Sequence, residues 1–428
     1  MNRRTVLTGG AAALASTALA SCGAAPSGTV LDLWAMGREG EVVGDLVPQF
    51  ERENPRTRVR VQQLPFTAAH EKLLTAFVGD ALPDMAQLGN SWVPEFAALG
   101  ALEPLDARVA TTPAIPRVDY FPGIWDSNII DGGLYGIPWY VDTRLLFYRR
   151  DILRRAGFDH PPRDWAEWRA QMVAIKKLVG PDRYAAYFPL NEYEPLEILG
   201  LQMPEPMILD DARANFGNAG FRHALDFYLG AIRDGLAPLA TSTQVANIWD
   251  EFDRGWFSFH VTGPWQIGEF RRRLPAAHQD RWMTAPMPGP TGPGVSNAGG
   301  SSLVVFRSSR KQDAAWRLVE FLSRPDIQMR FHALTGDLPP RISVWKSPEL
   351  ARDSHARAFG EQMTRLRPTP KVPEWERIAT SLALVTEKAA HGQLTADQAV
   401  ARLDQASNDI LAKRRWILAR SRGRQATA

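Results

Sequence analysis

Tryptophans stand beside polar side chains at several points of this chain, which holds fourteen of them. An indole ring suits a flat, partly apolar ligand because it buries a large area and keeps one polar edge. Asp, Asn, Glu and Arg side chains bind hydroxyl groups, and the charged ones form the stronger hydrogen bonds. The clearest groups are Asn90 with Trp92, Trp139 and Tyr140 with Asp142, and Trp265 after a Gly-Pro pair. Each aromatic residue also suits a protein core, so both interpretations stay open.

Strands and helices alternate in the first hundred residues and would position these side chains. Alternating apolar residues predict strands at 29–36 and 57–65, and a short strand is predicted at 84–90. Between them, apolar residues at helical spacing predict helices within 41–55 and 68–84. This order predicts an α/β lobe in which helices flank a mainly parallel sheet.

Cys22 is the single cysteine of the chain. It follows a charged start, MNRR, and a short run of small apolar residues, which is typical of a secretory signal and too short to span a membrane. Leu19-Ala20-Ser21-Cys22 resembles the bacterial lipobox, in which the cysteine thiol carries a diacylglycerol group. We therefore predict a signal peptide at 1–21, a lipid anchor at Cys22 and a flexible tether at 22–28. Arg3-Arg4 fits both a twin-arginine signal and an ordinary one.

Composition and charge argue against several classes of protein. The roughly 400 residues beyond the signal are too many for one core, so two lobes are expected. A net charge of +3 without a basic stripe in the body of the chain argues against nucleic acid as a partner. A single cysteine allows no internal disulfide, and the scattered histidines show no pair at metal-ligand spacing. No metal, no cofactor and no catalytic motif of the common hydrolase types is expected.

The end of the chain contains a helix signal followed by a basic stretch. Thr395 and Gln398 predict a capping box at the start of a helix. Residues 416–428 are rich in arginine and are expected to form a solvated basic tail.

Seven blocks of sequence, in collinear order over roughly residues 29–345, resemble the family 1 extracellular solute-binding proteins. Members of that family are the capture subunits of ABC importers for maltose-, trehalose- and glycerol-3-phosphate-type ligands. The blocks are FERENP, LLTAFVGDALPD, GALEPLD, GLYGIPWYVDTRLLFYRRDIL, PPRDWAEW, FHVTGPW and AGGSSLVVFRSSRKQDAAWRLVEFL. The resemblance implies a type II periplasmic-binding-protein fold like that of maltose-binding protein. Its two α/β lobes hold a ligand in the cleft between them and close by a hinge motion.

The same resemblance implies three chain crossings between the lobes. We expect them near 139–142, 296–300 and 338–341. The expected lobes are an N-terminal one, residues 29–140 and 299–340, and a C-terminal one, residues 141–298 and 341–415.

Open α/β sheets bind ligands beyond the carboxyl ends of their strands, so loops that follow strands should line the cleft. Trp265 matches the stacking tryptophan of the family. Gly299-Gly300 would either let a ligand approach the backbone closely or simply form a turn. The expected ligand-binding residues are Asn90, Trp92, Trp139, Tyr140, Asp142, Trp265, Gly299, Gly300, Arg341 and Trp375.

The resemblance, the tryptophans and the balanced charge favour capture of a neutral di- or oligosaccharide and its delivery to ABC permease subunits, without catalysis. The protein is expected to be an exported monomer, held by its lipid in the periplasm or on the outer face of the cytoplasmic membrane. A glycerophosphodiester or glycerol-3-phosphate-type ligand is the alternative, since Arg38 and Arg341 would suit a phosphate. A secreted glycosidase, which needs a pair of carboxyl groups about 5–10 Å apart, and a structural lipoprotein are more remote alternatives.

Overall fold

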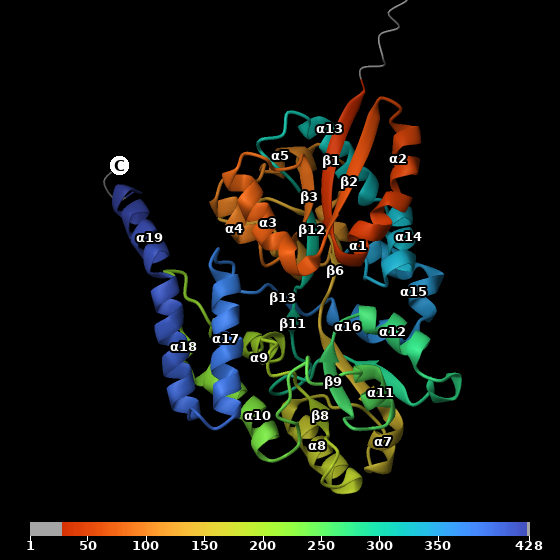
Figure 1. The fold of residues 1–428 in the computed structure, drawn as a ribbon, viewed down its shortest axis with the longest axis vertical. Helices are drawn as coiled ribbons and strands as arrows, with labels where there is room; N and C mark the ends of the chain where they lie inside the picture. The colour runs from red at the N-terminus through yellow and green to blue at the C-terminus, as the bar shows by residue number, and fades with distance from the viewer. Residues whose placement is uncertain (1–27, 426–428) are drawn as a thin grey trace, which may run out of the picture.

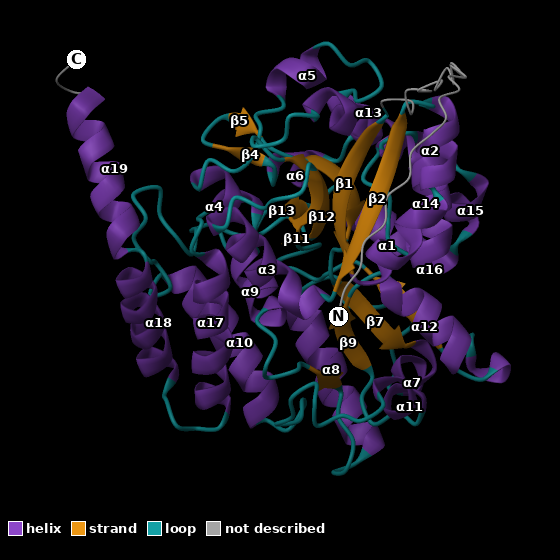
Figure 2. Ribbon diagram, turned by 45° about the horizontal axis from the view of Figure 1, so that its top comes forward, coloured by secondary structure: helices purple, strands orange, loops and turns teal. Residues whose placement is uncertain are grey.

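The chain folds into two lobes, each built around its own sheet (Figure 1). This computed structural model describes residues 28–425. The predicted signal peptide and Cys22 therefore lie outside the described residues. Helices surround both sheets (Figure 2), and three stretches of chain run from one lobe to the other.

The N-terminal lobe holds a five-stranded sheet with the order β2-β1-β3-β12-β6. β1 pairs in parallel with β2 and with β3, whereas β12 is antiparallel to β3 and β6. One strand therefore runs against the other four, and the predicted strands and mainly parallel sheet are confirmed. The strands of this lobe are β1 (Thr29–Met36), β2 (Thr57–Leu64), β3 (Met85–Gly89), β6 (Ile137–Val141) and β12 (Gly300–Val305), with a hairpin of β4 (Ile129–Ile130) and β5 (Gly133–Leu134).

Alternation along β12 divides the core of this lobe into two apolar layers. Leu303 and Val305 join the cluster on one face of the sheet, and Val304 and Phe306 join the cluster on the other. Because successive side chains of a strand point to opposite faces, helices must cover both faces. They are α1 (Gly37–Val42), α2 (Val47–Glu53), α3 (Phe66–Val78), α4 (Val93–Ala98), α5 (Asp106–Ala110), α6 (Pro122–Asp126), α13 (Gln312–Leu322) and α14 (Pro325–Thr335).

The C-terminal lobe holds a four-stranded sheet with the order β10-β7-β9-β8. β7 is antiparallel to both β10 and β9, and β8 runs parallel to β9. Its strands are β7 (Leu145–Arg149), β8 (Ala186–Tyr187), β9 (Phe259–Thr262) and β10 (Trp282–Ala285). The helices of this lobe and of the chain end are α7 (Arg150–Arg155), α8 (Trp165–Val179), α9 (Glu194–Leu201), α10 (Ala219–Arg233), α11 (Ile248–Asp253), α12 (Trp265–Arg273), α15 (Pro348–Arg352), α16 (Ser354–Gln362), α17 (Trp375–Ala390), α18 (Ala396–Ile410) and α19 (Ala412–Gln425).

Three passages of chain connect the lobes. The first leads from β6 to β7, the second from β11 (Ser296–Asn297) to β12, and the third from α14 to the 3-10 helix at Ile342–Lys346. The backbone N–H of Val141 donates to the carbonyl of Leu338 at 2.8 Å, and that of Asp142 donates to Gly299 at 3.2 Å. The first passage is thus hydrogen-bonded to both of the others.

Gly299 and Gly300 are required by this contact between passages. A Cβ atom on Gly299 would lie 2.3 Å from the carbonyl oxygen of Asp142. Gly300 has a φ of +112°, and a Cβ atom there would lie 2.3 Å from the carbonyl oxygen of Tyr140. These two glycines are therefore needed because two chain segments approach each other closely. The sequence alone suggests either ligand approach or a turn as the reason for them.

The end of the chain is more helical than expected. The predicted capping box of Thr395 and Gln398 is confirmed at the start of α18. Helix α19 then continues to Gln425 through most of the stretch 416–428, which was expected to be a tail (Figure 1). Among residues 28–425, no helix combines the length and the apolar character needed to cross a bilayer.

Candidate functional site

A cavity of about 650 Å³ lies where the two lobes and the three passages meet. It lies beyond the ends of β1, β3, β6 and β9, in agreement with the rule for open α/β sheets. Its wall contains seven of the ten residues predicted to bind ligand, namely Asn90, Trp92, Tyr140, Asp142, Trp265, Gly299 and Gly300.

Aromatic side chains face the cavity from both lobes. Phe66, which opens α3, and Trp92, which precedes α4, belong to the N-terminal lobe, and their ring centroids are 6.0 Å apart. Tyr193 precedes α9 and Trp265 opens α12 in the C-terminal lobe. Phe66 is 54% exposed although it is a large apolar residue. An exposed apolar ring in a concave site is typical of a ligand-binding surface.

Arg144 fixes the position of Trp265. Its guanidinium lies 4.5 Å from the centroid of the Trp265 ring, an attractive cation–π contact. The same guanidinium pairs with Asp142 and, at 3.2 Å, with Glu194 in the first turn of α9. Its backbone carbonyl accepts a 2.6 Å hydrogen bond from Ser296 Oγ. One partly buried side chain therefore links the first passage to two helix N-termini of the C-terminal lobe.

Two polar residues of the N-terminal wall have hydrogen-bond partners that leave capacity for a ligand. The hydroxyl oxygen of Tyr140 accepts from Gln87 Nε2 and from Ser301 Oγ, both at 3.0 Å. Its own proton is therefore free to be donated, and burial raises its pKa so that the proton stays in place. Asn90 donates from Nδ2 to the carbonyl of Ala298 at 3.2 Å and accepts from Ser302 Oγ at 2.9 Å.

Carboxyl groups outnumber cations on the wall. Burial raises the pKa of Asp142 to about 6, and the charges of Glu194 and Glu39 add to this rise, whereas Arg144 opposes it. The other acidic residues of the wall are Glu39, Glu194, Asp337 and Glu376, and its basic residues are Arg38 and Arg144. Within residues 28–425, no group of three or more His, Cys, Asp or Glu side chains is placed to hold a metal ion.

The structure places three of the predicted residues away from the cavity wall. Trp139 is buried in the N-terminal core and stacks on Phe331 with ring centroids 4.4 Å apart. Trp375 is fully buried in the C-terminal core, behind Tyr193. In each case a neighbouring residue, Tyr140 or Glu376, reaches the wall instead.

Arg341, the third of them, is engaged within the N-terminal lobe. Its Nε donates to Asp119 at 2.7 Å, and its Nη1 donates to the carbonyls of Ala114 and Ser323 at 3.0 and 2.9 Å. These bonds occupy the guanidinium and attach the third passage to the N-terminal lobe. A role in holding a phosphate in the cavity is therefore not compatible with its position.

Several residues of the wall were not predicted from the sequence. Glu194 begins a helix that the sequence indicates, because a proline follows in the first turn and Glu197 lies one turn later. Asp337 follows Gly336, which ends α14 in the left-handed conformation. Phe66 directly follows the strand predicted at 57–65, so the rule for strand ends could have found it. Tyr193 and Glu376 had no local signal that separates them from ordinary surface residues.

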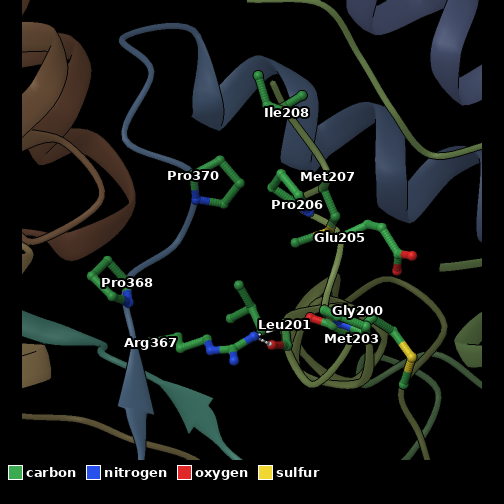
Figure 3. A pocket seen from close by; sticks show the side chains of 11 residues that line it. Gly200, Leu201, Met203, Glu205, Pro206, Met207, Ile208, Arg367, Pro368 and Pro370 are labelled. Carbon is green, nitrogen blue, oxygen red and sulfur yellow. Dashed lines mark hydrogen bonds between the residues drawn. The ribbon is translucent and has the colours of Figure 1, made fainter. Parts of the chain in front are cut away.

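A second cavity, of about 230 Å³, lies on the other side of one wall segment (Figure 3). Thr369 lines the interlobe cavity, whereas its neighbours Pro368 and Pro370 line this second one. Arg367 Nη1 donates to the carbonyls of Leu201 and Met203 at 2.6 and 3.0 Å. The second cavity thus lies beside the hydrogen bonds that join β13 (Leu366–Arg367) to the end of α9. It lacks the paired aromatic rings of the first cavity.

Glu197 lies in α9 beside the site and is fully buried, without a hydrogen-bond donor for either carboxyl oxygen within residues 28–425. Burial and the charges of Glu194 and Glu376 raise its pKa well above its ordinary value, near 4.5. As the pH rises above that value, the unfolded chain loses this proton while the folded chain keeps it, so stability falls. We expect Glu197→Gln to raise Tm at pH 7.5 by at least about 2 °C and to change it little at pH 4.

Calorimetry of the two proteins at both pH values tests this expectation. Glu205→Gln, at an exposed position, serves as the matched control and should leave Tm unchanged. A lower Tm for Glu197→Gln at pH 7.5 would mean that Glu197 is ionised and paired in the folded protein.

Two α/β lobes with a cavity lined by aromatic and polar groups at their passages define a two-lobed ligand-binding protein. The chain belongs to the bacterial extracellular solute-binding proteins, since the model of that family matches residues 37–329. The family named by the resemblance is therefore confirmed.

Three similar proteins cover most of the chain. The solved structure of the sugar-binding protein MalE from the phytopathogen Xanthomonas citri is 54% identical, with a TM-score of 0.89 over 91% of this chain and 99% of that one. A lipoprotein of the oleD 5′ region of Streptomyces antibioticus is 26% identical over 78% of this chain and 77% of its own. The galactooligosaccharide-binding protein of Bacillus subtilis (strain 168) is 23% identical over 92% of this chain and 94% of its own.

Proposed function

We propose that this protein captures a neutral di- or oligosaccharide between its lobes and delivers it to a membrane ABC importer. The observation that carries the proposal is that both lobes contribute aromatic rings to one cavity wall, Phe66 and Trp92 from the N-terminal lobe and Tyr193 and Trp265 from the C-terminal lobe, among polar side chains. A pyranose ring has an apolar C–H face that stacks on such rings and a rim of hydroxyls for the carboxylates, amides and arginine. The names of MalE and of the galactooligosaccharide-binding protein agree with a sugar ligand.

The charge of the cavity favours a neutral sugar over a phosphate ester. Five carboxyl groups line the wall against two guanidinium groups. Of these two, Arg144 is paired with Asp142 and Glu194, and Arg38 pairs with Glu41 at 3.1 Å. An anionic ligand would therefore meet net repulsion in a partly buried site.

Anchoring and delivery complete the proposed function. A lipid at Cys22 would hold the protein at the membrane surface and raise its effective concentration beside the permease. The Streptomyces antibioticus relative is named as a lipoprotein, which supports this arrangement. Closure of the lobes around the sugar would then present the loaded form to the permease.

Thermal unfolding of the mature chain without its lipid-bearing cysteine tests the ligand class. A sugar present at 100 times its Kd should add about 2.7 kcal/mol of stability, or about 3 °C in Tm for a chain of roughly 400 residues. The panel is maltose, trehalose, maltotriose and a galacto-oligosaccharide, compared with glycerol 3-phosphate and a glycerophosphodiester. A shift with the phosphate compounds alone favours the alternative ligand class, steady release of monosaccharide indicates a glycosidase, and no shift with any compound counts against capture.

Small-angle X-ray scattering tests closure. The radius of gyration is expected to fall when the stabilising sugar is added, because the lobes rotate toward each other. An identical scattering curve with saturating sugar would show that binding does not close the lobes.

A further inference from the structure

We propose that part of the interlobe cavity is a subsite for a protonated amine, so that the protein also takes sugars in which an amino group replaces a hydroxyl. The subsite consists of the carboxyl groups of Glu39, Asp142 and Asp337, referred to below as the acidic subsite. This inference rests on the proposed function, because the aromatic rings must hold the sugar that carries the amine.

The acidic subsite brings together three parts of the chain. Glu39 lies in α1 of the N-terminal lobe, Asp142 in the first passage and Asp337 in the third passage, and all three line the cavity. The side chain of Asp337 is only 5% exposed. Its Oδ2 is buried and receives no hydrogen bond from any donor within residues 28–425. A buried carboxyl group with an oxygen that has no donor is costly, and Asp337 lines the cavity, so a ligand that donates to this carboxyl group gains affinity.

The protein supplies no cation to Glu39 or Asp337. Within residues 28–425, neither of them has an ion-pair partner. The two cations of the wall are engaged elsewhere: Arg38 pairs with Glu41 at 3.1 Å, and the Arg144 guanidinium is shared between Asp142 and Glu194 and lies over Trp265. A positive charge on the ligand would therefore neutralise carboxyl groups that no cation among the described residues pairs with.

The unliganded subsite lowers its repulsion by holding protons. Burial, followed by the charges of Glu39 and Asp142, raises the pKa of Asp337 well above its ordinary value. Glu39 approaches Asp337 closely enough to share a hydrogen bond once one of the two carboxyls is protonated. An ammonium group replaces that proton with a fixed charge and three N–H donors, whereas a hydroxyl offers one donor and no charge.

Other titratable or polar groups around Asp337 do not supply the missing charge. His332 of α14 contacts the backbone carbonyl of Asp337 through Nδ1 at 2.8 Å, and burial lowers its pKa. Tyr140 of β6 keeps its proton because burial raises its pKa. Thr335 accepts from the Asp337 backbone N–H at 3.0 Å. An inorganic cation is a poorer occupant, since within residues 28–425 no three His, Cys, Asp or Glu side chains are placed to coordinate a metal ion together.

Isothermal titration calorimetry with two matched pairs of sugars tests the acidic subsite. The pairs are maltose with 6-amino-6-deoxymaltose or 6′-amino-6′-deoxymaltose, and trehalose with 6-amino-6-deoxytrehalose. In at least one pair, the amino sugar is expected to bind roughly tenfold or more tightly at pH 7, as charge-assisted hydrogen bonds replace neutral ones. Binding should release close to one proton, measured from the heats in two buffers of different ionisation enthalpy, and the preference should shrink at pH 5.

Variants separate this subsite from the rest of the cavity. Asp337→Asn is expected to bring the ratio of the two Kd values close to one, and Glu39→Gln provides a second variant if the first does not fold. Glu197→Gln removes a buried carboxyl outside the cavity wall and should leave the ratio unchanged. If the neutral sugars bind and the amino sugars bind equally or more weakly in both pairs, the acidic subsite is refuted while sugar capture stands. If no member of either pair binds, the inference falls together with the proposed function.

Discussion

Replacing Trp265 by alanine is expected to raise the Kd for the captured sugar by roughly 10- to 100-fold. Full burial of a large apolar side chain contributes about 1.5–3 kcal/mol, and each 1.4 kcal/mol is a factor of ten in affinity. Trp265 faces the cavity, and Arg144 holds its ring at 4.5 Å. The Trp265 ring is therefore held in place before the sugar binds. Because sugar binding does not have to order this ring, removing it saves no conformational entropy that could offset the lost stacking.

A second tryptophan provides the matched control for this experiment. Trp249 lies in α11 outside the cavity wall and also carries an arginine over its ring, with Arg273 at 3.9 Å from the centroid. Trp249→Ala should change Tm but leave the Kd within about twofold. Titration calorimetry of both variants makes the comparison. Equal losses of affinity in the two would show that the effect of Trp265→Ala comes from general destabilisation rather than from a lost stacking surface.

Replacing Gly300 by alanine is expected to produce the largest loss of stability among simple substitutions at the passages. A φ of +112° is one that a residue with a side chain rarely adopts, and the added Cβ atom would lie 2.3 Å from the Tyr140 carbonyl oxygen. Backbone strain costs about 1–3 kcal/mol and forced overpacking about as much again. We expect Tm to fall by about 2–7 °C, with a weaker sugar response because the passages shape the cavity.

Gly268→Ala serves as the control for Gly300→Ala. Gly268 lies inside α12, and no atom lies within 4 Å of the position that its Cβ would take. Alanine is favoured over glycine in a helix by about 1 kcal/mol, so Tm should stay level or rise. A Gly300→Ala protein with unchanged Tm would show that the two passages move apart easily, contrary to the contacts seen here.

The local sequence determined where the elements begin and which residues follow the strands. Alternation in residues 29–36 and 57–65 placed β1 and β2, and the capping box placed the start of α18. Asn90 and Trp92 follow β3 directly. Positions of this kind are readable because strand ends, helix caps and side-chain periodicity depend only on neighbours within a few residues.

Only the tertiary structure decided which of the aromatic and charged residues reach the cavity. Trp139 and Tyr140 are adjacent, yet one stacks on Phe331 in the core and the other lines the wall. Arg341 is held by Asp119, more than two hundred residues away in the chain, so no local pattern could show that its guanidinium is occupied.

The electrostatics of the site depend on the same long-range contacts. Glu194 reaches Arg144 across fifty residues, and Glu39 reaches Asp337 across nearly three hundred. A sequence shows which charges exist, but pairing and burial decide whether a carboxyl is neutralised, protonated or left open to a ligand. Composition and motifs therefore determined the class of this protein, whereas the packing of the two lobes decided which side chains form its binding site.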